Sequence, residues 1–461
     1  MPSAGRNRSR APSSRVSKFR KDMAAAGGLM AALVTAVWLL WWQLVTTHDA
    51  HAYAHAHTII RRRILDVLRH PSTMVNMSTV EMIQANGYLA ETHQVETQDG
   101  YKLQLHRIPY GRSSLSSCSP SSSSPKCSPP PSSFTSRPPV LLHHCLLCSS
   151  SDFVMNSPDK ALAYVLADAG YDVWLTNARG NTYSRAHATL TPDQKEFWEF
   201  SWHEMGMYDL PAAIDYVLDT TSKPTLDYVG FSMGTTVFWV MLSERPDYAE
   251  KVNVMVAMGP VAFVQHVQGP LRFAAPFVNI IERSLSMAGR YEMLSFGSFM
   301  DRMLSVFCDE RALTAAICHN LLFLVAGPNP TRLNKSFLPV LLAHTPAGTS
   351  VRTVTHFLQL INSGTFRQYD FGHFSNLAHY GSLTPPDYNL SRVACPVGLF
   401  WSPADWLATP EDVKRLETHL PNLVQSKAVQ DDAFSHLDFV WASDAEELVY
   451  RDVLKFLKSF H

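Results

Sequence analysis

The chain has 461 residues, of which 46% are hydrophobic and only 17% are charged, and its formal net charge is -1. Soluble domains contain about 25% charged residues, so this composition favours a protein that lies outside the cytosol or faces lipid. The balanced charge excludes a general nucleic-acid-binding surface, which needs a strong basic excess. At this length, one large domain with an inserted subdomain is expected.

The N-terminal region predicts membrane targeting. Residues 1–22 form a basic tail, and residues 23–47 form an uncharged apolar run with three tryptophans near its far end. About 20 apolar residues span a bilayer, and the basic flank stays in the cytosol. We therefore expect a signal anchor, with the rest of the chain lumenal or extracellular. The alternative is a cleaved signal peptide, with small residues between Ala50 and Ala56 as cleavage sites and a secreted or lysosomal product.

Cysteines and glycan acceptor sequences point to the same compartment. The chain has seven cysteines, so at least one is unpaired. Cys308 and Cys318 are spaced to close a short loop and are the predicted disulfide, the alternative being two buried free thiols. Asn76, Asn334 and Asn389 begin Asn-x-Ser triplets and are the predicted glycosylation sites.

The region before the main alternating pattern divides into three parts. Residues 48–77 contain a His/Ala stretch and are expected to be a solvated linker rather than a metal site. Residues 92–97 and 101–108 predict a β-hairpin around an Asp-Gly turn. Residues 112–139 are rich in Ser and Pro, a composition that cannot form a packed core, and are expected to be a disordered insertion.

From residue 139 onward, strand and helix patterns alternate. Strands are expected at 140–142, 171–175, 226–229, 252–258 and 396–401, and helices at 161–169, 210–218, 235–242 and 411–419. This alternation predicts a parallel sheet. Residues 263–388 interrupt it with helix-like segments rich in Met, Phe and Leu, which predict a helical cap. The α/β core is then expected to cover residues 78–262 and 389–461.

The pentapeptide Gly230-Phe231-Ser232-Met233-Gly234 predicts a reactive serine. A G-x-S-x-G pattern places the serine on a sharp turn between a strand and a helix, and the glycines are required because side chains there would collide with the neighbouring strand and helix. The flanking segments have the expected strand and helix character.

A serine hydroxyl needs a base to activate it and an acid to orient that base. In this architecture the acid and then the histidine follow the serine along the chain. Asp405 comes directly after a predicted strand, and His436 lies in a loop before the last helix. These two residues are the predicted acid and base. Asp438 and His419 are the alternative acid and base.

Three longer stretches carry a family resemblance: Asn177-Ala178-Arg179-Gly180-Asn181-Thr182-Tyr183-Ser184, Phe200-Ser201-Trp202-His203-Glu204-Met205-Gly206 and Pro346-Ala347-Gly348-Thr349-Ser350. With them, the chain resembles the acid lipase family, the gastric and lysosomal lipases of the α/β-hydrolase fold, over residues 78–461 apart from the Ser/Pro insertion.

The resemblance implies Ser232 as nucleophile, Asp405 as orienting acid and His436 as base, with no cofactor and no metal. It implies hydrolysis of neutral lipid esters, either triacylglycerols or steryl esters, through an acyl-enzyme in lipid catabolism. The apolar cap is then expected to act as a lid over an acyl groove.

Two departures from the family pattern concern the predicted oxyanion hole. Phe231 and Met233 replace the usual His and Gln of the elbow, but Met233 still supplies a backbone N–H, so we expect altered electrostatics or acyl fit. The family has His-Gly-Leu-Leu where this chain has His144-Cys145-Leu146-Leu147. The second donor is predicted to be the Leu146 N–H.

If the family glycine is needed at positive φ or for close approach to the substrate, Cys145 costs about 1–2 kcal/mol and displaces that donor. An impaired lipase-like protein that binds lipid or a partner is therefore the alternative function. A second alternative function is another serine hydrolase activity, on amides or thioesters. Cys145 and Cys148 also form a Cys-x-x-Cys beside two histidines, but no other cluster supplies zinc ligands at the required spacing, so we predict no metal or redox role.

Overall fold

The computed structural model describes residues 73–112, 137–295 and 338–461. The predicted basic tail, apolar run and most of the linker lie outside these residues, as do most of the Ser/Pro insertion, the Cys308–Cys318 pair and Asn334. Within the described ranges, no helix is long and apolar enough to cross a membrane.

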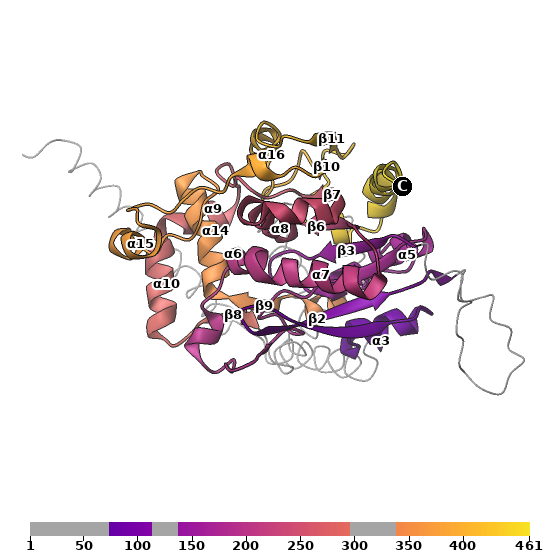
Figure 1. The fold of residues 1–461 in the computed structure, drawn as a ribbon, viewed down its shortest axis with the longest axis horizontal. Helices are drawn as coiled ribbons and strands as arrows, with labels where there is room; N and C mark the ends of the chain where they lie inside the picture. The colour runs from indigo at the N-terminus through magenta and orange to yellow at the C-terminus, as the bar shows by residue number, and fades with distance from the viewer. Residues whose placement is uncertain (1–72, 113–136, 296–337) are drawn as a thin grey trace, which may run out of the picture. The chain divides into compact units, whose positions relative to one another are not determined.

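A nine-stranded mixed sheet forms the centre of the fold (Figure 1). Its order is β1-β2-β4-β3-β6-β7-β10-β11, with β5 paired to β2. The strands are β1 (Glu91–Glu96), β2 (Tyr101–Ile108), β3 (Pro139–His143), β4 (Asp172–Leu175), β5 (Ala186–His187), β6 (Leu226–Phe231), β7 (Val252–Met258), β10 (Val397–Trp401) and β11 (Leu423–Ala428).

The sheet is parallel from β4 to β11, as the alternating pattern predicts. The expected hairpin is confirmed, because β1 pairs antiparallel with β2 along its whole length. The second hairpin strand continues into the sheet, where His106 of β2 lies opposite Leu175 of β4 in an antiparallel ladder.

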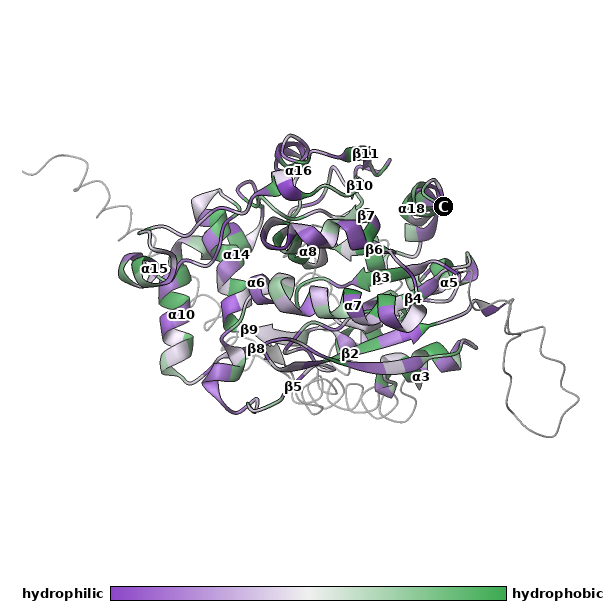
Figure 2. Ribbon diagram, viewed as in Figure 1, coloured by the Kyte–Doolittle hydropathy of each residue, from purple (hydrophilic) through white to green (hydrophobic). Residues whose placement is uncertain are grey.

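Two hydrophobic layers cover the faces of the sheet, because alternate strand residues point to opposite sides. Val140 and Leu142 of β3 pack in one layer with residues of α5 (Leu162–Asp168) and α18 (Arg451–Lys458). Leu141 packs in the other layer with residues of α7 (Leu210–Thr221) and α8 (Met233–Glu244). In Figure 2 the helices around the sheet carry both hydrophilic and hydrophobic residues, as expected for elements with one buried side.

Further helices flank the core and fill the segment between β7 and β10. The first group comprises α3 (Thr79–Ala85), α6 (Trp202–Glu204), α16 (Pro410–Glu417) and α17 (Asp438–Trp441). The second comprises α9 (Pro270–Ala274), α10 (Val278–Met287), α13 (Leu338–His344), α14 (Val351–Ser363) and α15 (His373–Tyr380), with a two-stranded antiparallel sheet of β8 (Glu292–Ser295) and β9 (Ala347–Ser350). Ser350 caps α14 by accepting from the Thr353 N–H, and Gly364 ends it in the left-handed conformation.

The last residues of the predicted linker are part of the packed fold. The 3₁₀ turn η1 spans Thr73–Asn76, and Met74, Val75 and Met77 pack against the core. The Met74 carbonyl accepts a hydrogen bond from His344 Nε2 at 3.1 Å. Apolar side chains therefore tie this stretch to the fold before the sheet begins.

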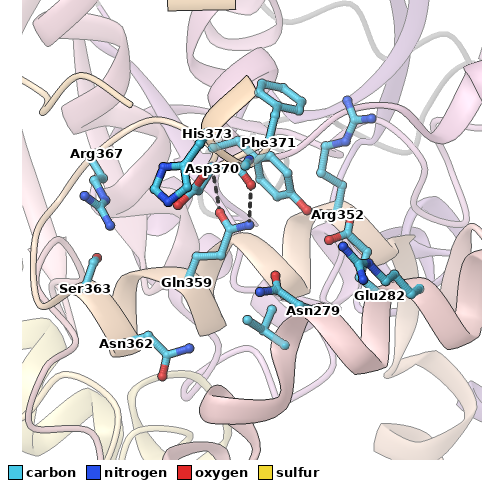
Figure 3. Close-up of a pocket in the computed structure, with 14 residues that line it drawn as sticks. Asn279, Glu282, Arg352, Gln359, Asn362, Ser363, Arg367, Asp370, Phe371 and His373 are labelled. Atoms are coloured by element: carbon cyan, nitrogen blue, oxygen red, sulfur yellow. Dashed lines mark hydrogen bonds between the residues drawn. The ribbon is translucent and has the colours of Figure 1, made fainter. Parts of the chain in front are cut away.

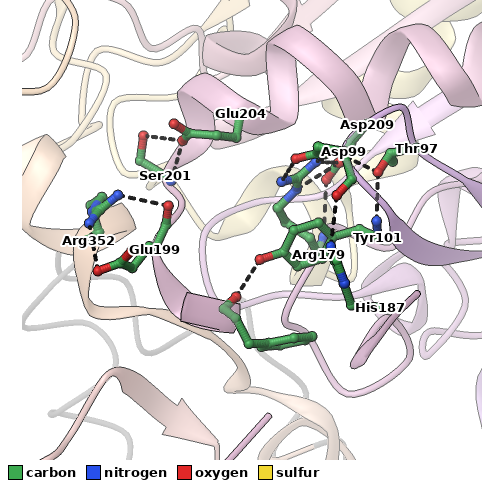
Figure 4. A network of polar contacts seen from close by, with 11 residues as sticks. Thr97, Asp99, Tyr101, Arg179, His187, Glu199, Ser201, Glu204, Asp209 and Arg352 are labelled. Atoms are coloured by element: carbon green, nitrogen blue, oxygen red, sulfur yellow. Dashed lines mark hydrogen bonds and ion pairs between the residues drawn. The ribbon is translucent and has the colours of Figure 1, made fainter. Parts of the chain in front are cut away.

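A buried ion-pair network joins the β1–β2 turn to the segments that follow β4 (Figure 4). Arg179 is 1% exposed and donates to both carboxylate oxygens of Asp99, at 2.6 and 2.9 Å. Its Nε donates to Asp209 at 2.8 Å, and its guanidinium lies 3.9 Å from the ring centroid of Tyr101. The network fixes loops that sequence patterns alone leave unplaced.

Candidate active site

Ser232 sits on the turn between β6 and α8 with φ 55° and ψ -116°. A Cβ on Gly230 would come within 2.9 Å of the Gly234 carbonyl group, and a Cβ on Gly234 would collide with the carbonyl oxygen of His143. These contacts are with backbone atoms that have no room to move. The steric reason for the two glycines is therefore confirmed, and the strained serine projects from a tightly packed elbow.

The structure brings the three predicted catalytic side chains into hydrogen-bonding contact. Ser232 Oγ lies 2.7 Å from His436 Nε2, and His436 Nδ1 lies 2.7 Å from Asp405 Oδ2. The other Asp405 oxygen accepts from the backbone N–H groups of Leu407 and Ala408, both at 2.8 Å. Asp405 therefore fixes the proton of His436 on Nδ1, and Nε2 is left to accept from the serine.

Packing holds the His436 ring in place. Gly259, at φ 54°, lies under the ring, and a Cβ there would be 3.0 Å from His436 Cε1. The ring of Phe231 lies on another side, with centroids 5.2 Å apart. Phe231, one of the two departures in the elbow, is thus a buried neighbour of the base, whereas the Met233 side chain is buried in the second hydrophobic layer.

The alternative acid and base lie elsewhere. Asp438 accepts from the Ser435 N–H at 2.6 Å and so caps the loop that carries His436. His419 is exposed near the end of α16, where its Nδ1 hydrogen-bonds the Arg415 carbonyl at 2.8 Å. In the described chain, His419 hydrogen-bonds Thr418 and Arg415 rather than Ser232 or His436.

The predicted oxyanion loop emerges beside the elbow, because His143, the last residue of β3, pairs with Gly230 of β6. Among the described residues, the Leu146 N–H has no hydrogen-bond acceptor. Met233 is the first residue of α8, where a backbone N–H has no partner within the helix. Both predicted donors are therefore available to an incoming oxygen atom.

Cys145 does not carry the backbone strain that its place in the motif suggests. The non-glycine residues at positive φ in the described chain are Leu147, Ser222 and Ser232, and Leu147 has φ 63°. The strain of a positive φ therefore does not arise at Cys145, because the turn is made two residues later. Cys145 is instead joined to Cys148 by a disulfide, with Cα atoms 5.2 Å apart. This pairing was missed, since the sequence does not show which cysteines meet.

His144 connects this loop to the segment after β4. Its Nδ1 donates to the Cys145 carbonyl at 2.8 Å, and its Nε2 accepts from the Ala178 N–H at 3.0 Å. Nε2 can accept this bond only while the ring is neutral, and burial lowers the pKa of His144 to about 4. Sequence reasoning missed this role, because no motif spacing marks a histidine whose partners are backbone groups and the Asn181 amide.

Asp152 is a second residue that the sequence patterns missed. Its carboxylate accepts from the Ser149 N–H at 2.9 Å, from Thr345 Oγ1 at 3.1 Å and from Trp441 Nε1 at 3.0 Å. Burial raises the pKa of Asp152 to about 6. The carboxylate thus ties the chain after the oxyanion loop to α17, which follows the His436 loop.

The other predicted sites are placed as follows. Asn76 and Asn389 are exposed. The described residues contain no group of three or more His, Cys, Asp or Glu side chains that could hold a metal ion.

A separate polar cavity of about 530 Å³ lies between α10, α14 and the chain at residues 367–373 (Figure 3). Arg352, Arg367 and Glu282 are among its lining residues, and none of the three predicted catalytic residues is. Gln359 bonds the backbone N–H and carbonyl of Asp370, both at 2.9 Å, so its amide is already engaged. A lining of this kind is unlike an apolar acyl groove.

Comparison with known proteins identifies the family. Residues 138–443 match the family described as the alpha/beta hydrolase fold, and residues 79–157 match a partial alpha/beta-hydrolase lipase region. Lipase 3 of Drosophila melanogaster is 40% identical over 82% of this chain and 92% of its own length. Gastric triacylglycerol lipase of Bos taurus is 36% identical over 91% of this chain and 99% of its own length. The human gastric triacylglycerol lipase is 37% identical over 84% of this chain and 93% of its own length.

A solved structure from Sulfolobus solfataricus has the same fold, with a TM-score of 0.54 at 14% identity over 81% of this chain and 94% of that one. The identities to the curated relatives far exceed that level and extend over nearly the whole of each relative. The chain belongs to the lipase family of the α/β-hydrolase fold.

Proposed function

We propose that the protein hydrolyses neutral lipid esters through an acyl-enzyme on Ser232, with His436 as base and Asp405 as orienting acid. The observation that carries the proposal is the continuous hydrogen-bonded series from Ser232 to His436 to Asp405, with both links at 2.7 Å. The serine is 8% exposed, and the other two residues are 1% exposed. A buried series of this kind is the arrangement that activates a serine hydroxyl at neutral pH.

The reaction follows from the geometry. His436 Nε2 takes the proton of Ser232 as its Oγ attacks the ester carbonyl carbon, and the developing oxyanion accepts from the N–H groups of Met233 and Leu146. The protonated histidine then gives the proton to the leaving alcohol, and the acyl group remains on the serine. Water loses a proton to His436, attacks the acyl carbon and releases the fatty acid, after which the proton returns to Ser232.

The substrate is proposed to be a triacylglycerol or a steryl ester, and the names of the gastric triacylglycerol lipases that the chain is similar to favour the former. The cap proposed for residues 263–388 also suits a lipid substrate, because it leaves large apolar side chains exposed. Phe273 is 75% exposed, Phe277 57% and Ile280 63%. We propose that this segment is a lid inserted into an α/β core of residues 78–262 and 389–461.

The protein is proposed to act in the secretory pathway or outside the cell. Asn76 and Asn389 are exposed and so accessible to glycosylation in that compartment. The Cys145–Cys148 disulfide also suits it, because disulfides persist in oxidising compartments. We further propose that residues 23–47 anchor the protein in a membrane; cleavage after this segment would instead release it. The N-terminal sequence of the mature protein decides between the two.

A substrate panel with a Ser232→Ala control tests the proposal. Purified protein is given emulsified triacylglycerol, steryl ester, a soluble short-chain ester, an amide and a thioester. Hydrolysis of the lipid esters that is lost in the variant is the expected result. A folded protein that hydrolyses none of the panel but binds lipid would contradict the proposal and support the impaired lipase-like alternative. A preference for the amide or the thioester would point to a different serine hydrolase.

A further inference from the structure

The Cys145–Cys148 disulfide spans the backbone that carries a predicted oxyanion donor. Leu146 lies between the two cysteines, and its N–H has no acceptor among the residues that the structure describes. The cysteines are 4% and 2% exposed, so the bridge lies inside the protein. No hydrogen bond within the described protein stabilises the orientation of this N–H in the resting fold. Its orientation must therefore be imposed by the chain on either side of it.

Hydrogen bonds hold the flanks of this segment but not the Leu146 N–H. The Cys145 carbonyl accepts from His144 Nδ1 at 2.8 Å and from the Cys148 N–H at 3.2 Å. The Leu147 carbonyl accepts from the Ala347 N–H at 2.6 Å. Leu147 also adopts φ 63°, a conformation that costs a leucine free energy unless the surroundings impose it. The disulfide closes the turn in which this strained residue lies.

The bridge is poorly suited to stabilising the whole fold. The chain-entropy gain from a disulfide grows with the length of the loop that it closes, and here the cysteines are only three positions apart. Its main effect is therefore local, on the conformations open to residues 145–148. A preorganised donor contributes to catalysis because it needs no rearrangement when charge develops on the substrate.

We propose that the Cys145–Cys148 bridge is a positioning element that holds the Leu146 N–H in the oxyanion hole. This inference rests on the proposed function, since it requires that Ser232 form a tetrahedral intermediate. Without the bridge, the turn at Leu147 relaxes and the donor spends less time aimed at the oxyanion. Binding of the ground-state ester changes little, because the interaction strengthens only as the transition state forms.

The test compares wild-type protein with the double variant Cys145→Ala/Cys148→Ala on a soluble ester. We expect kcat to fall on the order of 10- to 100-fold, less than the roughly 100- to 1000-fold cost of deleting a donor outright. KM should stay within about twofold of the wild-type value. Affinity for a boronic acid that mimics the tetrahedral intermediate should fall in parallel with kcat, whereas affinity for a non-reactive ether analogue should not.

Cys395→Ala is the matched control, because Cys395 is a buried free cysteine in the second hydrophobic layer. It should leave kcat near the wild-type value. A second measurement avoids substitution. In mild denaturant, a phosphine reduces the bridge to two thiols and is itself oxidised to a phosphine oxide, whose oxygen comes from water. The thiols are then alkylated and the protein is refolded. The kcat of this protein should again be low.

Unchanged kcat in the folded double variant would overturn the inference and leave the proposed function intact. Detection of free Cys145 and Cys148 thiols in active wild-type protein by mass spectrometry would also overturn it. If wild-type protein shows no Ser232-dependent hydrolysis, the proposed function fails instead. The wild-type and Ser232→Ala measurements therefore separate the two failures.

Discussion

Asp405 Oδ2 lies 2.7 Å from Nδ1 of His436, and the second oxygen of the same carboxylate is bound by two backbone N–H groups. The side chain is fully buried, so it has no freedom to exchange partners. The carboxylate therefore sets which nitrogen of the imidazole carries the proton, and only one tautomer presents a lone pair to Ser232.

Asp405→Asn is expected to lower kcat roughly 1,000- to 10,000-fold, because an amide that donates to Nδ1 favours the wrong tautomer of His436. Asp438→Asn is the matched control, since Asp438 accepts from the Ser435 N–H and so caps the loop that carries His436. It should reduce stability modestly and retain most of the activity. Steady-state kinetics of both variants check the assignment, and a larger loss in Asp438→Asn would reverse it.

Gly234→Ala is expected to prevent assembly of the elbow. The added Cβ would meet the carbonyl oxygen of His143, which is fixed in the centre of the sheet. Overpacking usually costs about 1–3 kcal/mol, and the loss here should reach or exceed the upper end because backbone atoms cannot swing aside. Gly87→Ala is the comparison, because a Cβ there meets no atom within 4 Å. It should cost only about 1–2 kcal/mol, through its positive φ. Urea denaturation measures both, and equal losses would contradict the steric explanation.

Arg179→Met is expected to destabilise the fold by about 3–5 kcal/mol, because it leaves Asp99 and the buried Asp209 without their partner (Figure 4). The comparison is Lys251→Met, which removes a surface ion pair with Asp215. The side chain of Lys251 is 37% exposed and that of Asp215 is 43% exposed. Such a pair contributes about 0–1 kcal/mol. Free energies of unfolding that differ by less than about 1 kcal/mol between the variants would show that the Arg179 network does not bear on stability.

The pH dependence of stability should carry the signature of His144. Burial lowers its pKa in the folded protein to about 4, whereas an unfolded histidine titrates near 6.5. As the pH falls from about 6.5 to 4, the unfolded chain takes up a proton that folded His144 does not. The contribution is therefore fully present above pH 6.5 and declines on acidification, by about 3 kcal/mol near pH 4.

His144→Gln removes the titrating group, so its unfolding free energy should fall less steeply over the same pH range. Denaturation curves at several pH values measure the two slopes. Parallel slopes for the variant and the wild-type protein would contradict the assignment of a lowered pKa to His144.

The sequence predicted the parts of the site that local patterns determine. Gly230 and Gly234 mark the elbow because their side-chain positions are sterically forbidden, and the order of Asp405 and His436 follows from the connectivity of the sheet. Leu147, rather than Cys145, carries the positive φ, and its carbonyl is bonded to the distant Ala347 N–H, a contact that no local pattern encodes. The partners of His144 and Asp152 were likewise out of reach, since they are backbone or single side-chain groups brought together only by folding.

The central claim is that Ser232 forms the acyl-enzyme, and trapping that intermediate tests it most directly. Protein turning over a soluble ester is quenched in acid during the first turnovers, digested and examined by mass spectrometry. An acyl group on the peptide that contains Ser232, absent from Ser232→Ala, is the expected result. An active wild-type protein whose acyl group is found on another residue, or whose activity survives Ser232→Ala, would contradict the claim.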